Sequence, residues 1–219
     1  MLSRTQIRWI GILAMIGGAI WAVSWTLNAF TQDGSQAVLG LSERGWRTIL
    51  NPALLFFIAG LTGHQLRSAR RLRTLGKIGF VTSLVGLVAM LVGNVIEFWI
   101  GELLYVDVPG KFKPTDHVGW DMFLTGFVIL SIGLILLGIA HLNAKLLFGW
   151  RRILPLSIGL VPLVLLLLAV VARLLVDAPP DNLLFPMLYA FALGWIALGY
   201  DLWSSTLEEP NANAVKPQI

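Results

Sequence analysis

The chain lacks cysteine entirely and is poor in charge. With no cysteine among 219 residues, a disulfide, a thiolate metal site and a cysteine nucleophile are all excluded. Charged residues make up 13% of the chain, which leaves too few polar groups to cover the surface of a soluble domain. Hydrophobic residues make up 57%, which excludes a disordered chain. The composition therefore predicts an integral membrane protein.

Catalytic signatures are missing as well. The sequence contains no glycine-rich phosphate loop, no HExxH motif and no GxSxG motif. We therefore expect no catalytic residues and no cofactor, and the pattern favours a protein that is not an enzyme. Basic residues exceed acidic ones by 16 to 12, and they lie in short segments between apolar runs. That placement indicates orientation in a membrane and not a nucleic-acid surface.

Six apolar runs are long enough to cross a hydrocarbon core of about 30 Å, which needs roughly 20 residues. They cover residues 9–30, 49–66, 76–100, 119–142, 153–176 and 183–203. The sequence thus predicts an all-α polytopic membrane protein, a bundle of six transmembrane helices that forms a single domain over residues 1–205. Asn51-Pro52 is expected to start the second helix. The polar residues 206–219 are expected to form a short disordered cytoplasmic tail.

Most of the 16 basic residues fall on one side of these spans. That side comprises the N-terminus, the connector RSARRLRTLGK (67–77), the connector after the fourth span and the tail. Cytoplasmic loops of membrane proteins carry the excess of lysine and arginine. We therefore expect both termini to be cytoplasmic and the chain to lie in the cytoplasmic membrane of the cell.

Small residues recur every seven positions on two neighbouring spans. The third span carries Gly79, Gly86 and Gly93, and the fourth carries Gly126, Gly133 and Ala140. Lipid gives helices no hydrophobic reason to associate, so small residues that permit close approach mark contact faces. The two ladders predict an antiparallel hairpin of the third and fourth helices.

A polar cluster is expected near the outer interface. Glu97 lies 20 residues beyond Lys77 and Arg173 lies 21 beyond Arg152, which places both about 30 Å from the inner side at 1.5 Å per residue. Ionisable groups in spans usually face the bundle interior and pair. We expect a Glu97–Arg173 pair with these neighbours: Asn94, Asp121, Asn28, Asn51 and Asp177. The cluster is interpreted as an ion pair that fixes helix register, as a ligand or ion vestibule, or as separate groups reaching water.

The three histidines raise two further hypotheses. His117 and Asp121 are spaced to share a helix face, and with Glu97 they are candidates for a divalent metal site. His64 and His141 lie at matching depth at the inner ends of their spans, as bis-histidine haem ligands would. The alternative without a ligand is that a histidine near a helix C-terminus is favoured by the helix dipole alone.

The motifs GNVIEFW (93–99) and DHVGWDMFLTG (116–126), with the basic connector before the fifth span, carry a resemblance over most of the chain. The chain resembles a loose class of small multi-pass bacterial membrane proteins without an assigned function, which implies no activity and no site residue. We expect an accessory or scaffold component of a membrane assembly, with the lipid bilayer and other membrane subunits as partners. The alternatives are a small-solute or ion permease using Glu97 and Arg173, and a haem- or metal-binding membrane protein.

Overall fold

A computed structural model describes residues 3–31, 43–68, 72, 74–100, 114–144, 149–176 and 181–204. Six helices are long and apolar enough to cross a membrane, as the sequence predicts. They are α1 (Arg4–Thr31), α2 (Glu43–Ser68), α3 (Thr74–Val95), α5 (Pro114–Ala144), α6 (Leu154–Val176) and α7 (Asp181–Ser204). A π-helical turn, η1 (Ile96–Ile100), continues α3, and a 3-10 turn, η2 (Gly149–Arg152), precedes α6. The predicted tail lies outside the described residues.

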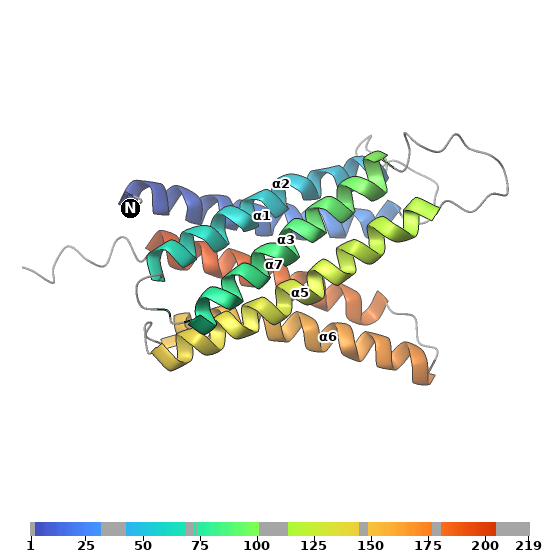
Figure 1. Cartoon of the computed structure of the whole chain (residues 1–219). Coiled ribbons are helices and arrows are strands. Elements are labelled where there is room, and N and C mark those ends of the chain that lie inside the picture. The colour runs from blue at the N-terminus through green and yellow to red at the C-terminus, as the bar shows by residue number, and fades with distance from the viewer. Residues whose placement is uncertain are drawn as a thin grey trace, which may run out of the picture.

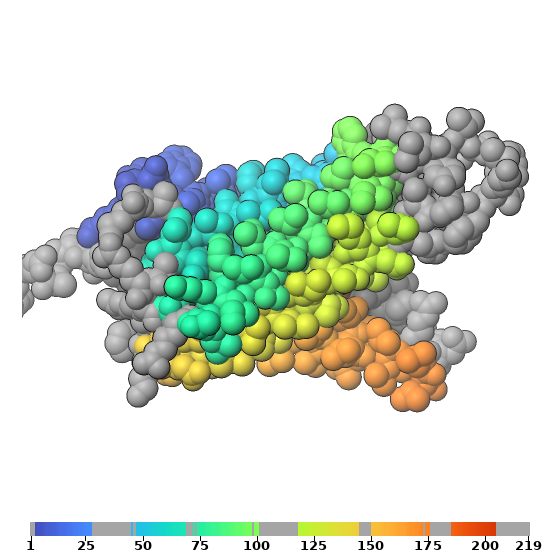
Figure 2. All heavy atoms as spheres, in the orientation of Figure 1, coloured from blue at the N-terminus to red at the C-terminus, as the bar shows by residue number. Residues whose placement is uncertain are grey.

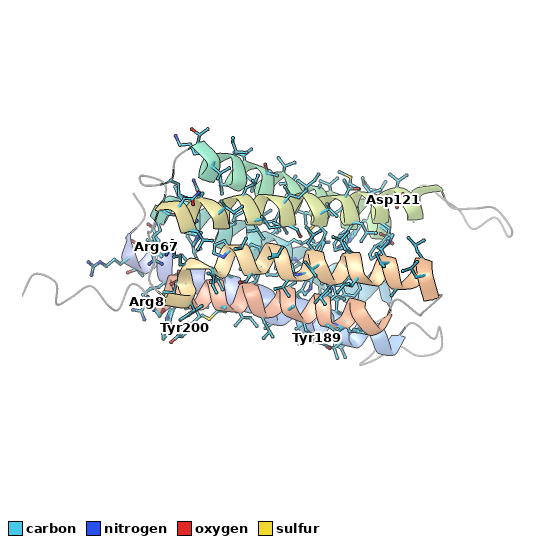
Figure 3. The ribbon with its side chains drawn as sticks, turned by 90° about the horizontal axis from the view of Figure 1, so that it is seen from below. Arg8, Arg67, Asp121, Tyr189 and Tyr200 are labelled. Atoms are coloured by element: carbon cyan, nitrogen blue, oxygen red, sulfur yellow. The ribbon has the colours of Figure 1, made fainter. Side chains whose placement is uncertain are left out.

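The six helices lie side by side along one long axis (Figure 1), and their contacts close them into a ring. Each helix contacts its neighbours in sequence, and α7 returns to pack against α1. The helices alternate in direction, so α1 begins and α7 ends at the same end of the bundle, which we call the termini end. Figure 3 places Arg8, Arg67 and Tyr200 towards this end and Asp121 towards the opposite one, which we call the far end.

Glycines bring α3 and α5 into backbone contact. A Cβ at Gly86 would lie 2.4 Å from the Leu130 nitrogen and 2.6 Å from the Gly126 carbonyl oxygen. The same approach repeats one heptad away on either side, at two further pairs: Gly79–Gly133 and Gly93–Gly119. The predicted antiparallel hairpin is therefore confirmed. Its ladder on α5 starts one heptad earlier than predicted, since Gly119 also faces α3.

A second glycine seam, not predicted from the sequence, joins α1 to α7. A Cβ at Gly11 would lie 2.6 Å from the Gly199 carbonyl oxygen, and one at Gly199 would lie 2.5 Å from the Gly11 carbonyl oxygen. One heptad further along α1, a Cβ at Gly18 would lie 2.7 Å from the Ala192 carbonyl oxygen. The chain therefore closes its ring of helices with the same small-residue packing that joins α3 to α5.

Aromatic side chains fill the middle of the bundle. Five large rings, from α1, α2, α5 and α7, are buried to 2% exposure or less: Trp21, Phe57, Phe127, Phe191 and Trp195. The Phe57 and Trp195 ring centroids lie 4.4 Å apart, and those of Trp21 and Phe191 lie 5.0 Å apart. Such contacts provide dense packing across helices that are distant in sequence.

The start of α2 differs from the prediction. Helix α2 begins at Glu43, so Asn51-Pro52 lies about two turns inside it and does not start it. Proline removes one backbone hydrogen bond from a helix interior, and a helix survives this where other contacts hold the turn. Here the Asn94 side chain of α3 donates to the Arg47 carbonyl in that turn. Pro162 lies inside α6.

Candidate functional sites at the two ends of the bundle

The far end carries a polar cluster between α2 and α3, formed by Arg47, Asn51, Asn94 and Glu97, which we call the far-end cluster. The Asn94 Nδ2 donates to the Asn51 Oδ1 at 2.7 Å and to the Arg47 carbonyl oxygen at 3.1 Å. Asn94 is buried, and both bonds cross from one helix to another. A buried amide with two such partners stabilises one relative position of α2 and α3.

Arg47 is the cation that faces Glu97. Its Nη1 lies 4.0 Å from the Glu97 Oε1, and both side chains are 14% exposed. The guanidinium carbon also lies 5.8 Å from the Trp25 ring centroid and 5.9 Å from that of Trp120. Both indoles are within the range of cation–π attraction. Arg47 therefore connects α2 to α1, η1 and α5 at once.

Glu97 lies in the π-helical turn η1, whose backbone rests on α5. A Cβ on Gly119 of α5 would lie 2.6 Å from the Glu97 Cβ and 2.7 Å from its nitrogen. The absence of a side chain at Gly119 is thus what lets the Glu97 backbone rest on α5. Gly93, four residues earlier, faces Gly119 as well, so Glu97 stays on the side of the glycine ladder while its carboxylate reaches Arg47 of α2.

The residues predicted for this cluster fall into three groups. Glu97, Asn94 and Asn51 are brought together, and Asp121 is exposed on α5 and outside their contacts. The side chains of Arg173, Asn28 and His117 lie outside the described residues, and so does Asp177. The Glu97–Arg173 pair and the metal set of His117, Asp121 and Glu97 therefore stay predictions. Arg47 was missed because the second helix was expected to begin after it.

Neutralising Glu97 is expected to destabilise the bundle modestly. Since both partners are mostly buried, Glu97→Gln should lower the free energy of unfolding by about 1 kcal/mol. The matched control is Asp121→Asn, which neutralises an exposed carboxylate at the same end. Denaturant titration in mild detergent measures both values. Equal losses for the two variants would show that Arg47 does not stabilise the fold through Glu97.

The termini end carries a second polar cluster, formed by Arg67, Arg151 and Asp201, which we call the termini-end cluster. Asp201 on α7 is 1% exposed and meets two cations. Its Oδ2 accepts from the Arg67 Nη1 of α2 at 3.0 Å, and its Oδ1 lies 3.2 Å from the Arg151 Nε of η2. Arg151 also donates to the Ser204 hydroxyl at 3.4 Å. One carboxylate thus links three elements.

Two buried histidines lie beside this cluster. His64 is one turn before Arg67 on α2, and His141 ends the buried face of α5. They are 3% and 0% exposed, and their ring centroids lie 4.8 Å apart. The matching depth predicted for them is therefore accompanied by direct ring contact. A haem placed between them would need the two rings on opposite faces of the macrocycle, and rings this close leave it no room.

Within the part of the chain that the structure describes, no three histidine, aspartate or glutamate side chains converge on one point. Asp201 was not singled out from the sequence, although it interrupts an apolar run as plainly as Glu97 does. The residues flanking it, LGYDLWS, give the same signal of a carboxylate that needs a buried partner.

Comparison with known proteins gives no match for this chain among protein-family models, curated proteins or solved structures.

Proposed function

We propose that the chain is a multi-pass protein of the cytoplasmic membrane, with both termini cytoplasmic, and that it acts as an accessory or scaffold component of a membrane assembly. The orientation is supported by the basic residues that gather at the termini end. These are Arg4, Arg8, Arg67, Arg151 and Arg152. Cytoplasmic segments carry such an excess. The scaffold role depends on one surface, the outer face of α3.

The outer face of α3 carries one stripe of β-branched side chains. They recur at alternating intervals of three and four, and each is 37–55% exposed: Ile78, Val81, Val85, Val88 and Val92. The opposite face of α3 carries the glycine ladder that packs on α5. Figure 2 shows α3 running along the visible surface with its outer side uncovered by other described elements. The spacing is that of a coiled-coil seam, in which side chains interdigitate with those of another helix.

The exposed face of α6 has a different character. It is broader, with nine exposed positions, five leucines and four valines: Leu160, Val161, Val164, Leu167, Leu168, Val170, Val171, Leu174 and Leu175. A broad face of mixed leucine and valine suits lipid tails, whereas the narrower stripe of α3 is β-branched throughout. The rigid β-branched chains of α3 lose little rotamer freedom on packing, which favours a protein neighbour. We therefore assign the partner surface to α3 and the lipid surface to α6.

A permease receives less support from the geometry. The mid-bundle is filled by packed rings, so a solute crossing along the axis would have to displace Trp21, Phe57 and Trp195. The buried hydroxyls of Ser83 and Ser131 donate to carbonyls four residues earlier on their own helices. The described ion pairs join helices at the two ends of the bundle and not at the midplane, where transporters keep their substrate sites.

Site-specific photocrosslinking tests the scaffold role. The benzophenone analogue of phenylalanine is placed at Val85, which is 53% exposed on α3, and separately at Leu167, which is 56% exposed on α6. Irradiation of native membranes should give a discrete protein adduct from Val85, because a partner helix covers that stripe. Its mass distinguishes a second copy of the chain from a different subunit.

The Leu167 variant is the matched control, since its exposure is close to that of Val85 and its expected neighbour is lipid. It should give no discrete protein adduct. The proposal is overturned if Val85 yields only lipid adducts, or if both positions give the same pattern of bands.

A further inference from the structure

The two buried imidazoles at the termini end are incompletely hydrogen-bonded. The His141 Nδ1 lies 2.8 Å from the Leu137 carbonyl oxygen. A carbonyl only accepts, so this nitrogen carries the hydrogen and the His141 Nε2 carries a free lone pair. The Nε2 of His141 and both ring nitrogens of His64 lack a hydrogen-bond partner among the described residues. A buried polar group left in this way costs about 1–3 kcal/mol.

We propose that His64 and His141 form a site for a divalent transition-metal ion that prefers imidazole nitrogen, such as zinc, copper or nickel. Two imidazoles bound to one zinc at about 2.0–2.1 Å, in adjacent tetrahedral positions, have ring centroids about 5 Å apart. The observed separation is 4.8 Å, with the ring planes inclined by 33°. The two rings thus already have the spacing that a shared ion requires.

The hydrogen bond of His141 is the second feature of a metal ligand. A ligating histidine commonly donates its other ring N–H to a backbone carbonyl, which fixes the tautomer and the ring orientation. The Leu137 carbonyl does this for His141 and leaves the Nε2 lone pair available. Water would complete the coordination, because no third ligand converges within the described ranges.

Nearby charges set the strength of the site. Asp201 and Arg67 both interact electrostatically with His141. The carboxylate favours a bound cation, whereas the guanidinium opposes it, so removal of the Arg67 charge should tighten binding. This expected gain on removing a side chain distinguishes a site next to Arg67 from ions bound adventitiously elsewhere.

Metal titration of the full chain tests this site. The protein is purified in mild detergent through an affinity tag without histidine, stripped with a chelator and dialysed against Zn²⁺ alone. One bound ion per chain is expected, and it should raise the thermal midpoint of the wild-type protein. His64→Phe, which keeps an aromatic ring against His141, should weaken binding by at least about tenfold. Arg67→Gln should strengthen it.

His117→Phe removes the one remaining histidine of the chain and separates this site from the predicted set of His117, Asp121 and Glu97. It should leave the affinity of the His64–His141 site unchanged. A second spectroscopic readout uses Co²⁺, whose visible absorption reports nitrogen coordination in the wild-type protein without any substitution. The site is overturned if the wild-type protein binds no stoichiometric ion, or if His64→Phe binds as the wild type does. Neither result bears on the α3 surface, whose photocrosslinking is independent.

Discussion

Gly86→Leu is expected to separate α3 from α5 and to lower the free energy of unfolding by about 3 kcal/mol or more. Even a Cβ at this position would lie 2.4 Å from the Leu130 nitrogen and 2.7 Å from the Leu130 Cα. These are backbone atoms, so no side-chain rotation relieves the clash, and the two helices must move apart. Their separation would weaken packing along the whole seam, because Gly79 and Gly93 share it.

The matched pair of alanine variants isolates the cause. At Gly86 the added methyl group meets backbone, whereas at Gly63 the three nearest atoms all belong to the side chain of Ile10, so a side-chain shift relieves part of the contact. Gly86→Ala should therefore lose about 1–3 kcal/mol, and Gly63→Ala should lose clearly less. Denaturant titration in mild detergent, followed by tryptophan fluorescence, compares the two. Similar losses at both positions would show that contact with backbone is not what makes Gly86 sensitive to an added side chain.

The α3–α5 seam was predictable because its determinants are local and periodic. Glycines seven residues apart occupy one stripe on a helix, and two stripes on adjacent spans need only a short connection to meet. The α1–α7 seam uses the same chemistry, but Gly11 and Gly199 lie at opposite ends of the sequence. Nothing in either helix alone indicates its partner. That choice follows from closure of the ring of helices, which depends on all six together.

Polar partners were harder to predict for a similar reason. Counting helix rise gives the depth of Glu97, but a cation at that depth can belong to any of several helices. In the structure, Glu97 faces Arg47, which lies within α2 because that helix begins at Glu43. The π turn at η1 was not predicted either, because a π turn leaves no periodic signal in the sequence. The depth of Glu97 in the bundle was therefore predictable, whereas the helix that supplies its cation was not.

Asp201→Asn is expected to be the most damaging isosteric substitution at the termini end, with a loss of about 3 kcal/mol in the free energy of unfolding. The amide keeps the volume of the carboxylate and removes its charge. Arg67 and Arg151 would then face each other across a neutral group. Their side chains are 29% and 19% exposed, so water relieves part of the repulsion and holds the loss near the lower limit for a broken buried pair.

A double-mutant cycle separates this ion pair from general disruption. Arg67→Gln in the Asp201→Asn background removes the excess positive charge, so the double variant should lose less stability than the sum of the single variants. A coupling of at least about 1 kcal/mol is expected for partners 3.0 Å apart at a buried carboxylate. Additive losses would show that Asp201 acts through packing alone. Coupling would instead establish that one charge holds α2, η2 and α7 together at the end where the two histidines meet.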